Sequence, residues 1–208
     1  MDALSVQQAT LIGNSMGGKI AWMFAAEYPE RVSRLILVAL GGFSSREFRY
    51  GGKTTVPLLV RLLPDTLPTF MVRMTLAPAF GNRSALTNAI LERYRDMMLV
   101  PGNRNAMIAR MEQIELEPPE AMLARIKAPT LLLWGDKDLV IPVGNAIDFE
   151  TSIHDCQLVT LPNLGHLPQE EAPLRSLAPV AAFLDQSILG TDDPLDFPQS
   201  RSFKVRLP

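Results

Sequence analysis

The chain has 208 residues, of which 47% are hydrophobic and 20% charged, and its formal net charge is −2. This composition is ordinary for a globular protein, and the weak negative charge predicts no nucleic-acid partner. Apolar runs such as "LILVAL" are too short to span a bilayer, and "MDALSVQQAT" lacks the features of a signal peptide, so no membrane partner is expected. Cys156 is the only cysteine, which excludes an intrachain disulfide and predicts a cytoplasmic location.

Short apolar runs separated by helical patterns predict an α/β fold with a parallel sheet of about four strands. Residues 16–28, after the first run, have the spacing of a helix with a buried face. The expected strands lie at residues 6–14, 34–40, 130–134 and 157–161.

The interval from Gly42 to Lys127 shows no strand pattern and predicts a helical insertion. Its expected helices are Val56–Leu63, Thr69–Leu76, Ser84–Leu99 and Asn103–Glu115. It is rich in methionine, which adapts to irregular apolar surfaces. We expect these methionine side chains to pack in the apolar core between the helices, with the lining of a pocket as the alternative. They are Met71, Met74, Met97, Met98, Met107 and Met111.

The chain therefore divides into core residues 1–42, an insertion at 43–127, core residues 128–189 and a tail at 190–208 that we expect to be disordered. A last helix is expected from Glu170 to about Leu189. Because Pro179 falls inside it, this helix should be kinked there or divided in two.

A Gly-x-Ser-x-Gly motif, Gly13 to Gly17, joins the first expected strand to the first expected helix. In that context the motif indicates a nucleophilic serine, Ser15, on a strained turn. Gly13 and Gly17 should leave room for the close packing of this turn. The alternative is an ordinary turn serine.

A serine hydroxyl needs a base, and the sequence offers two histidines. His166 lies in the loop after the last strand, at the sheet edge where parallel α/β proteins build their sites. His154 precedes that strand in a polar stretch, so we expect it at the surface. The acid that orients the base could be Asp136 or Asp138, which both follow the third strand.

Three segments together resemble the α/β-hydrolase superfamily: "GNSMGG" its nucleophile elbow, "LLLWGDKDLVIP" its acid turn, and "GHLPQEEAP" its histidine loop with the E-x-P that follows. The resemblance implies that Ser15 is the nucleophile, His166 the base and Asp138 the acid, with Asp136 a solvated neighbour. It also implies that the Met16 N–H binds the oxyanion and that 43–127 form a cap. It implies no cofactor and no metal.

With a serine at the nucleophile position, the chain resembles the esterases, lipases, lactonases and C–C bond hydrolases of the superfamily. It differs from the members that use an aspartate at that position. "GNSMGG" with a helical cap resembles the hydrolases of diketone ring-fission products, but esterases carry the same six residues. The sequence predicts a small, largely apolar ester as substrate, with a diketone as the alternative.

The resemblance covers about residues 6–189, and in the superfamily the elbow follows the fifth of eight strands. The chain therefore resembles the C-terminal half of the fold, and we expect an N-terminally truncated hydrolase or a short protein that completes its sheet by dimerising. The first strand would then expose an apolar edge prone to self-association. Loss of a second oxyanion donor would cost roughly 3 kcal/mol of transition-state stabilisation, so an inactive fragment or a binding module is a third possibility.

Overall fold

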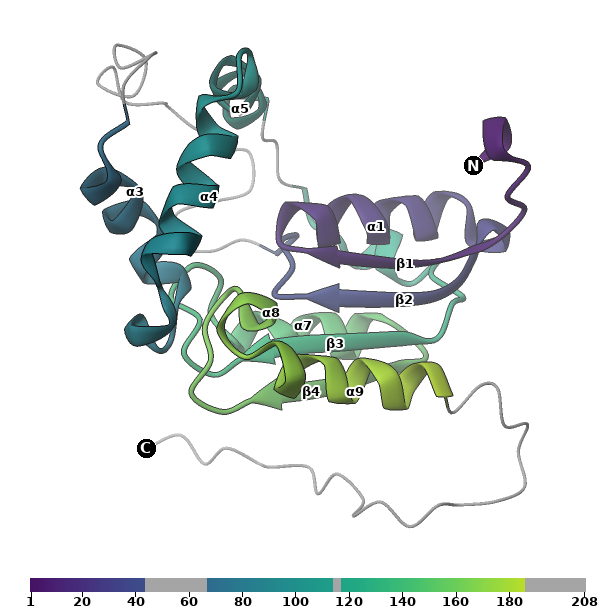
Figure 1. The fold of residues 1–208 in the computed structure, drawn as a ribbon. Helices are drawn as coiled ribbons and strands as arrows, with labels where there is room; N and C mark the ends of the chain where they lie inside the picture. Colours follow the sequence, from purple (N-terminus) through teal and green to yellow (C-terminus); the bar gives the residue numbers. More distant parts are fainter. Residues whose placement is uncertain (44–66, 114–116, 186–208) are drawn as a thin grey trace.

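The computed structural model describes residues 1–43, 67–113 and 117–185. In these ranges one sheet of parallel strands has the order β1-β2-β3-β4 (Figure 1). The prediction of an α/β fold with about four parallel strands is confirmed. The carboxyl ends of all these strands meet at one edge of the sheet. The strands are β1 (Ala9–Asn14), β2 (Val32–Val38), β3 (Thr130–Gly135) and β4 (Cys156–Leu161).

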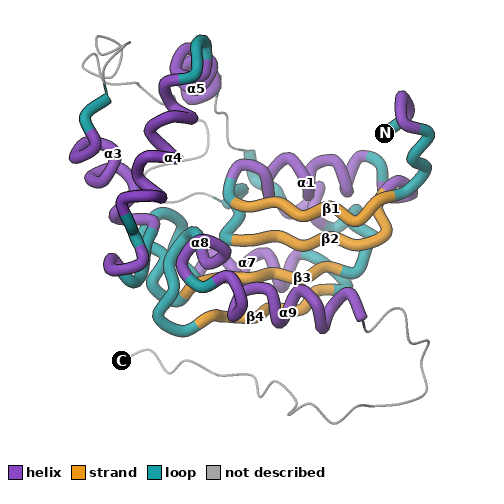
Figure 2. The backbone as a smooth tube through the Cα atoms, viewed as in Figure 1, coloured by secondary structure: helices purple, strands orange, loops and turns teal. Residues whose placement is uncertain are grey.

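Helices cover both faces of the sheet (Figure 2). Because strand side chains alternate, Leu35 and Leu37 of β2 join one core cluster and Ile36 joins another. The larger cluster includes Trp22, Leu123 and Phe149 from the helices of the first face, and the smaller one includes Phe183 from the helix of the second face. The first-face helices are α1 (Met16–Glu27), α6 (Glu120–Leu123) and α7 (Gly144–Ser152), and the second-face helix is α9 (Pro173–Asp185).

The segment between β2 and β3 contributes helices that lie beyond the carboxyl ends of the strands (Figure 1). It has its own apolar cluster, in which Val72, Phe80 and Leu91 pack with Leu167 from the loop after β4. The insertion is therefore packed against the edge of the sheet where the predicted site residues lie. Its main helices are α3 (Thr69–Leu76), α4 (Asn88–Leu99) and α5 (Asn103–Glu112), with single 3-10 turns at Ala77–Ala79 and Arg83–Ala85.

Three of the helices expected in the insertion are present among the described residues. α3 has the expected bounds, and the other two differ from the expectation at one end. The helix expected over Ser84–Leu99 begins at Asn88, because the Thr87 side chain accepts a hydrogen bond from the Ile90 N–H and caps it. The helix expected over Asn103–Glu115 is described as Asn103–Glu112, and that over Val56–Leu63 lies outside the described residues.

The last expected helix is two helices, but they divide before Pro173 and not at Pro179. α8 (Pro168–Glu171) ends at Ala172, whose φ of −149° and ψ of 73° are not helical. A residue before proline is disfavoured in the helical region, and this explains the break. Pro179 lies inside α9. The predicted tail at 190–208 lies outside the described residues.

β1, the outer strand on one side of the sheet, has little cover. β1 pairs only with β2 among the described strands, and Ile12 is 60% exposed. Ile20 and Met23 of α1 are also exposed beside it. No helix in the described ranges has the length and apolarity needed to cross a membrane.

Candidate active site

Ser15 lies on a strained turn between the end of β1 and the start of α1. Its φ of 53° and ψ of −117° place a non-glycine residue in a region that L side chains rarely adopt. The Ser15 N–H donates to the Val38 carbonyl at 2.9 Å, and this bond ties the turn to the end of β2. This geometry agrees with the strained turn expected from the sequence.

Close packing at the turn involves Gly13 and Gly18, and not the predicted pair Gly13 and Gly17. A Cβ on Gly13 would lie 2.4 Å from the Gly17 carbonyl oxygen, and one on Gly18 would lie 2.8 Å from the Leu40 Cβ. A Cβ on Gly17 would meet nothing within 4 Å. The expectation for Gly17 was wrong because a Cβ at this position would point into open space, while the Gly17 backbone forms the wall that Gly13 faces.

His166 and Asp138 form a buried pair. Asp138 Oδ2 lies 2.8 Å from His166 Nδ1, and the two side chains are 0% and 7% exposed. Asp138 Oδ1 accepts hydrogen bonds from the Val140 and Ile141 N–H groups at 2.8 and 2.9 Å. With the carboxylate fixed on both oxygens, the Nδ1 proton is assigned to the side facing Asp138. Nε2 is then the nitrogen that can accept a proton.

Asn14 connects the serine turn to the histidine loop, and the sequence reasoning missed it. Its Nδ2 donates to the Val38 carbonyl at 3.0 Å and to the His166 carbonyl at 3.1 Å. A polar residue directly before the serine, at the end of an apolar strand, was the signal that could have found it. In the described part of the chain no hydrogen bond joins the Ser15 hydroxyl to the His166 ring. Such bonds are often long before substrate binds.

The two rival site residues lie elsewhere. Asp136 Oδ1 accepts from the Asn163 N–H at 2.6 Å, and its side chain is 33% exposed. Asp136 therefore holds the turn after β4, whereas the expectation was only that its side chain is solvated. His154 is exposed and precedes β4, at the opposite end of the strands from His166.

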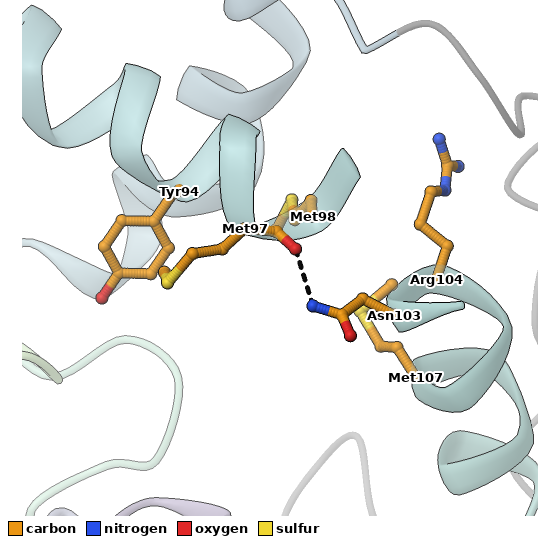
Figure 3. A pocket seen from close by; sticks show the side chains of 6 residues that line it. All are labelled: Tyr94, Met97, Met98, Asn103, Arg104 and Met107. Atoms are coloured by element: carbon orange, nitrogen blue, oxygen red, sulfur yellow. Dashed lines mark hydrogen bonds between the residues drawn. The ribbon is translucent and has the colours of Figure 1, made fainter. Parts of the chain in front are cut away.

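A cavity of about 230 Å³ opens between α4 and α5 (Figure 3). Its lining is Tyr94, Met97, Met98, Asn103, Arg104 and Met107. Asn103 Nδ2 donates to the Met97 carbonyl at 2.8 Å, which fixes that amide. Burial, and then the Glu170 carboxylate, raise the pKa of Tyr94 above its usual value, so its hydroxyl keeps its proton. Of the insertion methionines, Met97, Met98 and Met107 line this cavity, with Met97 and Met107 48% and 40% exposed, whereas Met74 is 71% exposed and does not line it.

Comparison with known proteins agrees with this geometry. The model of the alpha/beta hydrolase fold family matches residues 1–173. The chain belongs to this family.

Several similar proteins are named as hydrolases or lipases. A 2-hydroxy-6-oxo-6-phenylhexa-2,4-dienoate hydrolase of Burkholderia cepacia is 32% identical over 174 residues, which cover 82% of this chain and 60% of that protein. A membrane phospholipase A described as a bacterial virulence factor is 30% identical with a TM-score of 0.72, covering 90% of this chain and 60% of that one. The meta-cleavage product hydrolase CumD of Pseudomonas fluorescens IP01 has the same fold, with a TM-score of 0.74, 24% identity, and coverage of 90% and 68%. The chain spans about 60% of the length of the first curated relatives that it matches.

Proposed function

We propose that the chain carries the catalytic triad of a serine hydrolase, with Ser15, His166 and Asp138 as its members. The observation that carries this proposal is the buried Asp138–His166 pair, which Asn14 ties to the strained Ser15 turn. Ser15 Oγ attacks the acyl carbon of the substrate and gives its proton to His166 Nε2. His166 then protonates the leaving alcohol, and Asp138 stabilises the imidazolium. Water, deprotonated by His166, releases the acyl group from Ser15.

The oxyanion of the tetrahedral intermediate would accept a hydrogen bond from the Met16 N–H. Met16 is the first residue of α1, and the first N–H groups of a helix have no acceptor inside it. The dipole of α1 also favours negative charge at this end. Removing one oxyanion donor costs roughly 3 kcal/mol of transition-state stabilisation in enzymes of this kind.

The preferred substrate is an ester with a small, largely apolar acyl or alcohol group. The support is the methionine-lined cavity between α4 and α5, in the insertion that we propose to be the cap at residues 43–127. Thioether side chains pack against apolar and aromatic groups of varied shape. Tyr94, Asn103 and Arg104 also line the cavity, so polar substituents on an otherwise apolar substrate would meet hydrogen-bond donors. The Ser-His-Asp mechanism needs no cofactor or metal.

Hydrolysis of a C–C bond in a diketone is the second candidate, and a specific observation favours it. The curated relatives at 30% to 32% identity are hydrolases of 2-hydroxy-6-oxo-dienoates. A panel of p-nitrophenyl esters of increasing length, assayed beside a vinylogous 1,5-diketone acid, separates the two. Turnover of the diketone alone would exclude the ester proposal.

The first test is labelling by a fluorophosphonate, which reacts with activated serines. Wild-type chain should be labelled, and Ser15→Ala should lose the label. Ser152→Ala is the control, because Ser152 lies on α7 and its hydroxyl bonds only to the Asp148 carbonyl. Folded wild-type chain that resists labelling would contradict the proposal and favour the third candidate, an inactive fragment or binding module.

We also propose that a small molecule is the substrate partner and that the outer edge of β1 pairs with a second copy of the chain. The support is that no described strand pairs with this edge, that Ile12 is exposed, and that Ile20 and Met23 are exposed on α1, the helix that packs on β1. Light scattering after size exclusion should show a dimer that Ile12→Lys weakens; a monomer at every concentration would contradict pairing. The cytoplasmic location and the lack of nucleic-acid and membrane partners remain predictions.

A further inference from the structure

The histidine loop packs backbone to backbone against a segment of the insertion. The His166 N–H donates to the Ala79 carbonyl at 2.8 Å. A Cβ on Gly165 would lie 2.5 Å from both the Ala79 oxygen and the Gly81 nitrogen, and one on Gly81 would lie 2.7 Å from the Leu164 carbonyl carbon. Residues 79–82 and 164–166, which are far apart in the sequence, therefore form one contact with no space for side chains between them.

Glu171 closes this contact with both carboxylate oxygens. Oε1 accepts from the Gly165 N–H at 2.6 Å, and Oε2 accepts from the Asn82 N–H at 2.9 Å. Gly165 immediately precedes His166, whereas Asn82 belongs to the insertion. Hydrogen bonds to a charged acceptor are among the stronger ones in proteins, so one side chain holds two separate segments at a fixed distance.

We propose that Glu171 is a positioning residue, which sets the place of His166 by clamping its loop to residues 79–82 of the insertion. This inference rests on the proposed function, in which His166 is the base. The loop has other ties on its remaining sides: the Asn14 amide donates to the His166 carbonyl from the side of the nucleophile, and the Lys137 N–H donates to the Leu164 carbonyl at 2.9 Å from the turn that carries the acid. The base is therefore located between the sheet and the insertion, and a displacement of the insertion at Asn82 is transmitted to His166 through Glu171.

Because two N–H donors meet two carboxylate oxygens, Glu171→Gln tests whether both oxygens are needed to hold the loop against the insertion. Glutamine has the same shape but one acceptor, so one of the two N–H groups would face an NH₂ group. Glu171→Asp keeps both oxygens on a side chain shorter by one methylene and should restore part of the function. Glu170→Gln is the matched control: the neighbouring carboxylate forms an ion pair with Arg93 and bonds to neither Gly165 nor Asn82.

The experiment measures fluorophosphonate labelling of Ser15 and hydrolysis of p-nitrophenyl butyrate for wild type and these variants. Misplacing a catalytic group by about 1 Å costs on the order of 10²-fold in rate. Glu171→Gln should therefore lower the labelling rate and kcat by about tenfold to a hundredfold with KM nearly unchanged, and Glu170→Gln should match wild type. Equal rates in Glu171→Gln and Glu170→Gln, or a loss confined to KM, would overturn the inference.

A second readout does not depend on activity. Amide hydrogen exchange at Gly165 and Asn82 should be faster in Glu171→Gln than in Glu170→Gln, because these are the two N–H groups that the Glu171 carboxylate accepts from. Unchanged exchange would overturn the clamp. A wild-type chain that is not labelled contradicts the proposed function instead, and the exchange comparison still decides whether Glu171 holds the loop.

Discussion

β3 and β1 are six-residue parallel strands that both lead into the proposed triad, yet they are packed very differently. All six residues of β3 are buried between β2 and β4, and the strand leads to Asp138. In β1 only Gly13 is buried, Ile12 is 60% exposed, and the strand leads to Ser15. The acid thus follows an interior strand of the described sheet. The nucleophile follows an outer strand, and its turn is fixed by local hydrogen bonds, those of the Ser15 and Asn14 nitrogens.

The largest effect should come from the interior side of this comparison. Asp138→Asn removes the charge that stabilises the His166 imidazolium and offers an amide to Nδ1, which favours the wrong tautomer. A change of this kind costs about 10⁴-fold in kcat in serine hydrolases. The measurement is ester hydrolysis, with Asp136→Asn as the control, since Asp136 bonds to the Asn163 N–H. Equal losses in both variants would place the acid elsewhere.

The packing contrast itself can be tested with aliphatic truncations. Leu132→Ala in β3 removes a fully buried side chain and should lower the free energy of unfolding by about 2–5 kcal/mol. In chain dilute enough to be monomeric, Ile12→Ala in β1 removes a largely exposed side chain and should change the free energy of unfolding by less than about 0.5 kcal/mol. Urea denaturation measures both. A large cost at Ile12 would mean that the edge is covered in solution, as pairing with a second copy requires.

The elbow offers a matched glycine pair. Gly13→Ala forces a Cβ against the Gly17 carbonyl and should destabilise the fold by about 1–3 kcal/mol. Gly17→Ala meets open space in the first turn of α1 and should be neutral or stabilising by up to about 1 kcal/mol. Thermal unfolding compares the two variants, and the reverse order would show that the turn is built differently.

The smallest effect is expected at Asn14, the tie between the two halves of the site. Asn14→Ala removes the bonds to the Val38 and His166 carbonyls, each worth about 1 kcal/mol. The rate of fluorophosphonate labelling should fall about tenfold, by more than for Gln8→Ala, whose side chain bonds to an exposed carbonyl. Unchanged labelling would show that the loop is placed without this amide.

Sequence patterns predicted the strands better than the helix ends. Each expected strand is present, because short runs rich in apolar residues and bounded by turn residues, such as residues 131–134, are typical of strands in a parallel sheet. The expected helix start at Ser84 was wrong, and the last helix is divided in two before Pro173 and not at Pro179, because helix boundaries depend on single contacts such as the Thr87 cap and the Ala172–Pro173 junction.

The sequence by itself determined the family, the strained Gly-x-Ser-x-Gly turn, and the order of serine, acid and histidine along the chain. Each of these can be read from short motifs, whose residues are neighbours in the sequence, and from the order of those motifs along the chain. The tertiary structure decided which aspartate faces His166, and it placed His154 at the far end of the strands. It also showed that Asn14 and Glu171 tie the histidine loop to two other segments. Those relations join residues up to 152 positions apart, and a one-dimensional pattern carries no information on which backbone N–H or carbonyl will meet such a side chain.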